Sequence, residues 1–189
     1  MTQMWRTFIG AACLLTGAST IALAQKSYAL GVAGGVAVPV GKLSDTKKAG
    51  ASALAVLAIG VSDLPVGVRF DAFYNNLPRR SDLSSPQSGG AAVPNVDMRV
   101  AGAVANLVFA FPGSNSKAYM LAGAGLYNAK LDAAGAKSQN NLGFDGGLGA
   151  TFGSGPVAIF LEARYNSISR TTANGGVYHF VPITLGLLF

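Results

Sequence analysis

The chain has 189 residues, of which 50% are hydrophobic and 12% are charged, and its net charge is +6. A soluble domain usually has about a quarter of its residues charged, and a helical membrane protein needs runs of about 20 apolar residues, which do not occur after residue 24. The first class is therefore disfavoured and the second excluded, which leaves a protein that crosses a membrane as β-strands, where apolar and small residues alternate.

The N-terminal segment has the three parts of a secretory signal. Arg6 gives the first residues a positive charge, residues 8–23 are apolar apart from small and hydroxyl side chains, and Ala22-Leu23-Ala24 fits a signal peptidase site. We expect a cleavable signal peptide over 1–24 and one domain over 25–189. An uncleaved membrane helix is the alternative, and the hydroxyl side chains argue against it.

The single cysteine, Cys13, lies within this apolar stretch. The residues before it lack the leucine that opens a lipoprotein box, so we interpret it as part of the signal peptide. The mature chain then contains no cysteine and has no disulfide or thiolate chemistry.

Strands are predicted by period-2 alternation. It is clearest in four segments: 66–75, 142–152, 157–165 and 181–189. Four more segments read as strands in which small residues dominate both faces: 27–38, 51–62, about 97–110 and 118–128. In the third of these, Asn106 conflicts with the register set by Met98 and Val100, which suggests a bulge.

The predicted connections alternate in length. Segments rich in Gly, Pro, Asp and Ser make short turns at 62–65, 112–117 and 153–156. Longer segments occupy 39–50, 77–96, 129–139 and 169–177. An outer-membrane barrel has this arrangement, with short periplasmic turns and longer external loops.

The predicted fold is all-β, an eight-stranded antiparallel up-and-down transmembrane β-barrel in the cell outer membrane. A soluble lipocalin-like barrel is the alternative, and it would turn its apolar face inward. Here the apolar faces run to eight or ten residues with aromatic residues near the strand ends, as in the interface girdles of a membrane barrel. We expect these residues to include Tyr28, Tyr74, Tyr127, Tyr165 and Tyr178.

The mature chain resembles the small eight-stranded outer-membrane barrels related to the transmembrane domain of outer membrane protein A and to outer membrane protein X. The resemblance rests on the signal peptide, the strand count, the loop alternation and the last strand, 181–189, which ends in Phe189. That ending is similar to the signal read by the barrel assembly machinery, which the resemblance implies as a partner during insertion. Gly186 departs from the commonest form of this signal.

Five charged residues are expected inside the barrel, since an eight-stranded barrel is just wide enough to be filled by side chains. They are Arg69, Asp71, Asp145, Glu162 and Arg164. Opposite charges at similar heights can pair across the lumen and reduce the cost of their burial. We favour a polar network that holds the barrel shut over a gated pore or a general acid–base pair.

The long loops carry most of the remaining cations. They lie in or beside these loops and are Lys42, Lys47, Lys48, Arg79, Arg80, Arg99, Lys130, Lys137 and Arg170. Such a rim would attract the phosphates of lipopolysaccharide, although solvated charge without a partner remains equally open. Outer-membrane lipid is the expected surrounding, and nucleic acid is not an expected partner in this compartment.

We expect a monomeric barrel with a structural or surface-interaction role and with no cofactor, metal or enzymatic activity. A narrow pore or transporter is the alternative, and a lipid A-modifying enzyme is less favoured. Barrel deacylases resemble a hydrolase with histidine and serine two apart on one strand, whereas His179 is followed by Phe180 and Val181. Ser167, Ser169 and Glu162 on the preceding strand could supply such a site only through proximity.

Overall fold

The computed structural model describes residues 28–60, 65–80, 96–111, 113, 116–132, 138–153, 156–169 and 176–189. The predicted signal peptide at 1–24 lies outside these residues, as do Lys137 and Arg170. No helix among the described residues is long and apolar enough to cross a bilayer.

Eight strands form in the predicted order, and each overlaps its predicted segment. They are β1 (Tyr28–Val40), β2 (Gly50–Gly60), β3 (Val66–Leu77), β4 (Met98–Ala110), β5 (Ser116–Leu131), β6 (Gln139–Phe152), β7 (Ala158–Ser169) and β8 (Val177–Leu188). A short 3₁₀ helix, η1 (Gly41–Leu43), follows β1. The predicted strand count is therefore confirmed.

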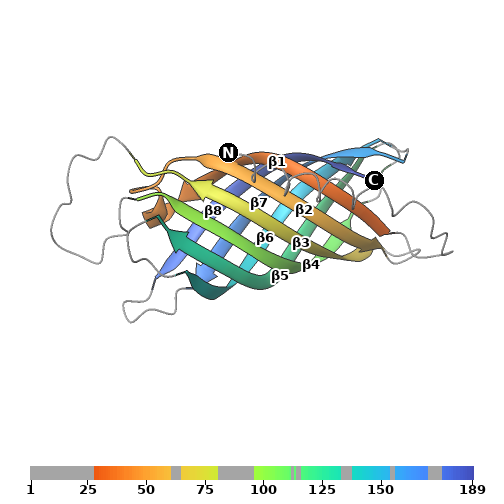
Figure 1. Ribbon diagram of the computed structural model, residues 1–189. Coiled ribbons are helices and arrows are strands. Elements are labelled where there is room, and N and C mark those ends of the chain that lie inside the picture. Colours follow the sequence, from red (N-terminus) through yellow and green to blue (C-terminus); the bar gives the residue numbers. More distant parts are fainter. Residues whose placement is uncertain are drawn as a thin grey trace, which may run out of the picture.

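The strands close into one barrel in chain order, each antiparallel to its neighbours (Figure 1). The seam joins β8 to β1, with Leu188 opposite Gly31 and His179 opposite Val40. At the end of the seam, the Leu30 and Phe189 backbones exchange two hydrogen bonds of 2.8 Å. The strand ends joined by the longer stretches of sequence, such as the end of β3 and the start of β4, lie at the left of Figure 1, and those joined by the short stretches, such as the end of β2 and the start of β3, lie at the other end of the barrel. Long loops mark the external end and short turns the periplasmic end.

Alternation along each strand sorts side chains between lumen and exterior. On β3, Arg69 and Asp71 are buried in the lumen, whereas Phe70 is 47% exposed outside. Leu107, Leu126 and Leu148 are more than 60% exposed on the exterior. A monomer in water rarely exposes an apolar patch above a few hundred Å², so this surface is the lipid-facing belt of a transmembrane barrel.

The aromatic girdle differs from the prediction. Tyr28, Tyr74 and Tyr165 face outward as expected, but Tyr127 and Tyr178 are buried in the lumen. Exposed phenylalanines complete the periplasmic edge at the ends of β4, β6 and β8: Phe109, Phe111, Phe152 and Phe189. The prediction was wrong for the two buried tyrosines because closeness to a strand end does not fix the face on which a residue lies.

The bulge expected near Asn106 is absent. The β3–β4 register runs unbroken from Val66 opposite Phe109 to Leu77 opposite Met98. Asn106, Met98 and Val100 all face the lumen and are nearly inaccessible to solvent. The conflict came from assuming a uniformly polar lumen, whereas the external part of this lumen is apolar.

Candidate functional site

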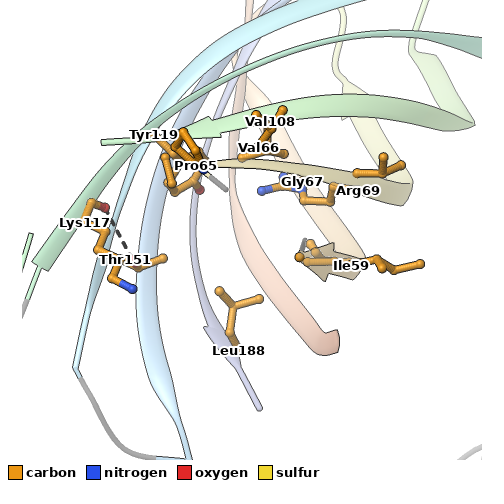
Figure 2. A pocket seen from close by; sticks show the side chains of 15 residues that line it. Ile59, Pro65, Val66, Gly67, Arg69, Val108, Lys117, Tyr119, Thr151 and Leu188 are labelled. Carbon is orange, nitrogen blue, oxygen red and sulfur yellow. Dashed lines mark hydrogen bonds between the residues drawn. The ribbon is translucent and has the colours of Figure 1, made fainter. Parts of the chain in front are cut away.

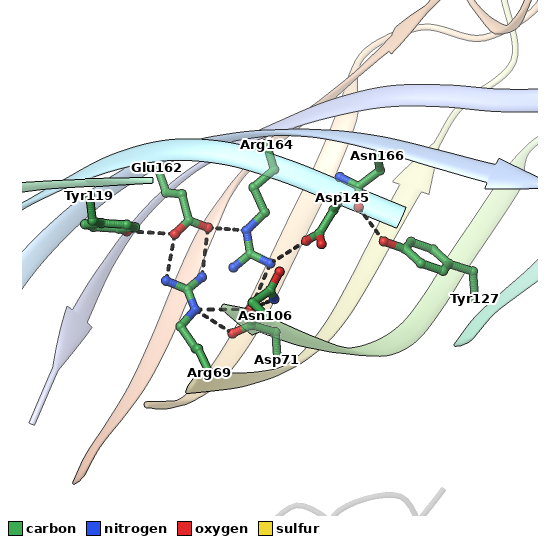
Figure 3. A network of polar contacts seen from close by, with 9 residues as sticks. All are labelled: Arg69, Asp71, Asn106, Tyr119, Tyr127, Asp145, Glu162, Arg164 and Asn166. Atoms are coloured by element: carbon green, nitrogen blue, oxygen red, sulfur yellow. Dashed lines mark hydrogen bonds and ion pairs between the residues drawn. The ribbon is translucent and has the colours of Figure 1, made fainter. Parts of the chain in front are cut away.

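The five charged residues predicted inside the barrel meet in one network at its centre (Figure 3). Each is at most 7% exposed. Arg69 Nε donates to Asp71 Oδ1 at 2.9 Å, and its Nη2 donates to Glu162 Oε1 at 2.9 Å. Strands β3 and β7 are thereby joined across the lumen.

Arg164 makes the remaining ion pairs. Its Nη1 lies 2.8 Å from Asp71 Oδ2 and 3.1 Å from Asp145 Oδ2, and its Nε donates to Glu162. Two guanidinium groups therefore hold three carboxylates. Buried charges are tolerated when they are paired and hydrogen-bonded in this way.

Two neutral residues complete the network: Tyr119, which the sequence pattern did not single out, and Asn106, at which the pattern had suggested a bulge. Tyr119 donates its hydroxyl to Glu162 Oε2 at 2.7 Å, and the Asn106 amide donates to Asp71 Oδ2 at 2.7 Å. The Arg69 guanidinium also lies 5.9 Å from the centre of the Tyr119 ring. Both residues come from strands rich in small residues, where the two faces differ little in hydrophobicity.

Glycines on β5 and β6 make room for these long side chains. A Cβ at Gly149 would overlap the Tyr119 ring, and one at Gly123 would overlap the Asn106 amide. These are neighbouring pairs in the barrel, since Tyr119 lies opposite Gly149 and Asn106 opposite Gly123. Once the register is known, a long side chain opposite an inward glycine identifies Tyr119 and Asn106 as lumen residues.

A small cavity of about 20 Å³ lies beside the network, bounded by Asn75, Glu162, Arg164 and other residues of β2, β3, β7 and β8. Arg164 Nη2 and Asn75 Oδ1 are buried and have no hydrogen-bond partner among the described residues. A cavity of this size holds about one water molecule when it has polar partners, and this donor and this acceptor meet that requirement.

Apolar side chains close the external part of the lumen. The cluster contains Ala37, Leu43, Leu77, Met98, Val100, Val104, Tyr127, Ile168, Tyr178 and Phe180, and we call it the apolar cap. Leu77, Met98, Tyr127 and Phe180 are fully inaccessible to solvent. The Tyr127 hydroxyl donates to Asn166 at 2.9 Å, which satisfies its polar group within the lumen. The cap is a second closure, external to the charged network, that the sequence pattern did not predict.

The periplasmic end is hollow by contrast. A cavity of about 240 Å³ opens there, with walls that include Val56, Val108 and Leu188 (Figure 2). Arg69 and Tyr119 also line it, which places the charged network at its inner end. The lumen thus changes along its axis from a hollow, to a charged centre, to a packed cap.

The predicted external cations are placed unequally. Lys42, Lys48, Arg79 and Lys130 are exposed near the external end, and we call these four residues the cationic rim. Arg80 is half-buried and donates from Nη1 to the carbonyl oxygen of Ser44 at 3.1 Å. Lys137 and Arg170 lie outside the described residues.

Lys47 is 1% exposed and so does not belong to the cationic rim. Its backbone N–H donates to the carbonyl of Leu43 at 3.0 Å, and its backbone pairs with that of Arg79. This turn carries it inward at the mouth of the barrel. Burial lowers the pKa of the Lys47 ammonium to about 8, and the charge of Asp97 opposes the shift.

The residues of the hydrolase alternative lie on two faces of the barrel wall. His179 stacks on Tyr165 outside, with ring centres 5.3 Å apart, and lies opposite Ser167 on β7. Glu162 points into the lumen, where Arg69, Arg164 and Tyr119 bind it. Glu162 therefore cannot complete a triad with His179. No group of three or more potential metal-ligating side chains was found in the described part of the chain.

No protein-family model and no curated protein sequence matches the chain. Among solved structures, Neisserial surface protein A is similar, with 19% identity over 86% of this chain and 97% of that one and a TM-score of 0.63. A major outer membrane protein from Thermus thermophilus is 12% identical over 86% and 99% of the two chains, with a TM-score of 0.53. The outer membrane enzyme PagL, 18% identical over 84% and 98%, has a TM-score of 0.45, which is too low to bear on activity.

These similarities concern the fold alone. The apolar exterior of the barrel agrees with a fold that lies in a membrane. A closed barrel with an apolar exterior and a filled lumen defines the class of small outer-membrane β-barrels. The protein is an outer-membrane β-barrel of eight strands, similar in fold to Neisserial surface protein A.

Proposed function

We propose that this protein is a monomeric, non-enzymatic barrel that supports the outer membrane and uses its external end to contact lipopolysaccharide. On this proposal the barrel assembly machinery inserts it, with Phe189 as part of the signal. The observation that carries the proposal is a doubly closed lumen beneath an exposed cationic rim.

The closed lumen favours a structural role over transport. A solute would have to part ion pairs such as Arg69–Glu162 and then pass the apolar cap. Aqueous channels are a property of barrels with about 16 or more strands. The narrow pore is therefore the weaker candidate.

The cationic rim favours an anionic partner. Lys42 and Lys48 flank the turn after β1, while Arg79 and Lys130 extend the positive charge to the ends of β3 and β5. Each cation near an anionic lipid surface contributes about 1 kcal/mol to binding. Lipopolysaccharide presents its phosphates at this external level.

Binding of purified lipopolysaccharide to the refolded barrel in detergent tests the proposal. Changing Lys42, Lys48, Arg79 and Lys130 together to glutamine should weaken binding at least about a hundredfold, and added salt should reduce binding by the unaltered protein. Lys117→Gln is the matched control because Lys117 is exposed near the periplasmic end. Equal affinity of the rim variant and the unaltered barrel would contradict the proposal.

Conductance in a planar bilayer tests the pore alternative. We expect no discrete channel openings from the unaltered barrel. The sample must be folded protein, which is recognised by its heat-modifiable band. Regular channel openings from such a sample would contradict the structural role and favour the pore.

A further inference from the structure

The exterior of the barrel has two unlike sides within the lipid belt. On β6, β7 and β8 bulky residues face the bilayer, among them Leu148, Leu161 and Leu185. On β2, β3 and β4 the residues at one level are Ala55, Ala72 and Ala103, which lie opposite one another across the strands. At this level the barrel wall is thin, because β2, β3 and β4 carry only alanine side chains on their outer faces.

This thin wall is the floor of a groove of about 600 Å³. Alanines of β2 to β5 line the groove, and Leu57, Phe70 and Leu126 project beside them. These strands run side by side across the barrel (Figure 1). A groove with this lining, facing the bilayer, fits an acyl chain.

A pair of cations lies beyond the external end of the same strands. Arg99 and Lys130 lie directly opposite each other on β4 and β5 and face outward. Like charges placed directly opposite on one face of a sheet destabilise it. Asp132 accepts a 2.6 Å hydrogen bond from Arg99, but one carboxylate leaves the trio with a net charge of +1.

The groove and the cations are continuous on one surface. Arg99 is four residues from Ala103 on the same face of β4, roughly 13 Å at the usual rise per strand residue. Asn128 and Asn140 mark the level where the apolar belt gives way to polar side chains, and the Asn128 amide donates to Asn140 at 2.6 Å. The cations thus lie at head-group level and the groove at acyl-chain level.

We propose that this face binds one molecule of lipopolysaccharide, with a lipid A phosphate between Arg99 and Lys130 and an acyl chain along the alanine groove. The inference rests on the proposed contact with lipopolysaccharide and assigns it to the barrel wall. A phosphate supplies the anion that the cation pair lacks. Lipopolysaccharide is the committed source because the cations lie toward the external end of the barrel.

Affinity for purified lipid A, measured by titration of the refolded full barrel, tests the site. Arg99→Gln and Lys130→Gln should each weaken binding about fivefold. Ala103→Leu fills the groove and should also weaken it, whereas Ala163→Leu, which faces lipid on β7, should not. A heat-modifiable band checks that every variant is folded.

The outcomes separate the two proposals. One outcome is that Arg99→Gln and Ala103→Leu bind lipid A normally while the triple glutamine variant of Lys42, Lys48 and Arg79 binds it poorly. In that case the proposed site on the barrel wall is wrong, and the proposed contact through the external loops is retained. If no variant alters binding, or if lipid A does not bind, both proposals fail. If Ala163→Leu weakens binding as much as Ala103→Leu, or phosphatidylglycerol binds as tightly as lipid A, the assignment to this groove or to this lipid is overturned.

Discussion

In the centre of the lumen, arginines and carboxylates hold one another by ion pairs, whereas toward the external mouth aromatic and aliphatic side chains fill the same space. The charged centre depends on every partner, because removing one leaves others buried without compensation. The apolar cap should lose stability in proportion to the atoms removed. The stability of the barrel should therefore depend strongly on every residue of the charged centre. It should depend on residues of the apolar cap only in proportion to the side-chain atoms that are removed.

The largest effect should come from Arg164→Met. Arg164 contacts Asp71, Asp145 and Glu162, so its loss leaves three carboxylates facing Arg69 alone. We expect the free energy of unfolding to fall by about 3–5 kcal/mol. Urea unfolding followed by the heat-modifiable band shift measures this loss.

Arg99→Met is the control for that experiment. Arg99 also pairs with a carboxylate, but both partners are exposed to solvent. Exposed ion pairs contribute about 0–1 kcal/mol. Equal losses from the two substitutions would contradict the contrast between buried and exposed pairs.

A smaller loss is expected in the cap. Leu77→Ala removes part of a fully buried side chain without exposing a charge. We expect a loss of about 2–3 kcal/mol, near the lower end for buried leucine, because side chains at a mouth can partly relax into the space. The same urea titration measures it, with Leu126→Ala on the lipid face as the comparison. A loss as large as that of Arg164→Met would remove the distinction between the two closures.

An effect no larger than the loss in the cap is expected from pH at the mouth of the barrel. The pKa of Lys47 is about 8 in the folded barrel and about 10.4 in an unfolded chain. Between these values the unfolded state binds more protons, so stability should rise with pH by at most about 1.4 kcal/mol per pH unit. Lys47→Met should lack this contribution, and the difference between the two proteins at pH 8 and pH 10 isolates it. If the stability difference between the unaltered protein and Lys47→Met were the same at pH 8 and pH 10, burial of the Lys47 ammonium would be contradicted.

The fold could be predicted because the two faces of several strands differ strongly in hydrophobicity. On β3 and β7 charges alternate with large apolar residues, so the alternation alone assigns Arg69, Asp71, Glu162 and Arg164 to the inward face. Asp145 is assigned in the same way, because it alternates with large residues on β6.

The apolar cap could not be predicted from that alternation. Met98, Val100 and Tyr127 are as apolar as lipid-facing residues, and hydrophobicity alone does not separate a packed lumen from a bilayer. Tyr119 was not identified, and Asn106 was interpreted as a bulge, for a related reason, since their strands are rich in small residues. Their place depends on cross-strand partners such as Gly149 and Gly123, which only the register reveals.

The seam between β1 and β8 has a consequence for the kinetics of folding. It pairs Leu30 with Phe189, residues close to opposite ends of the described chain. Loop-closure entropy must be overcome before such distant contacts form, which slows the closing step. Until β8 is in place, β1 and β7 each present an unpaired edge that can recruit another chain. The chain therefore most needs protection from aggregation just before β8 pairs with β1, when the barrel is still open.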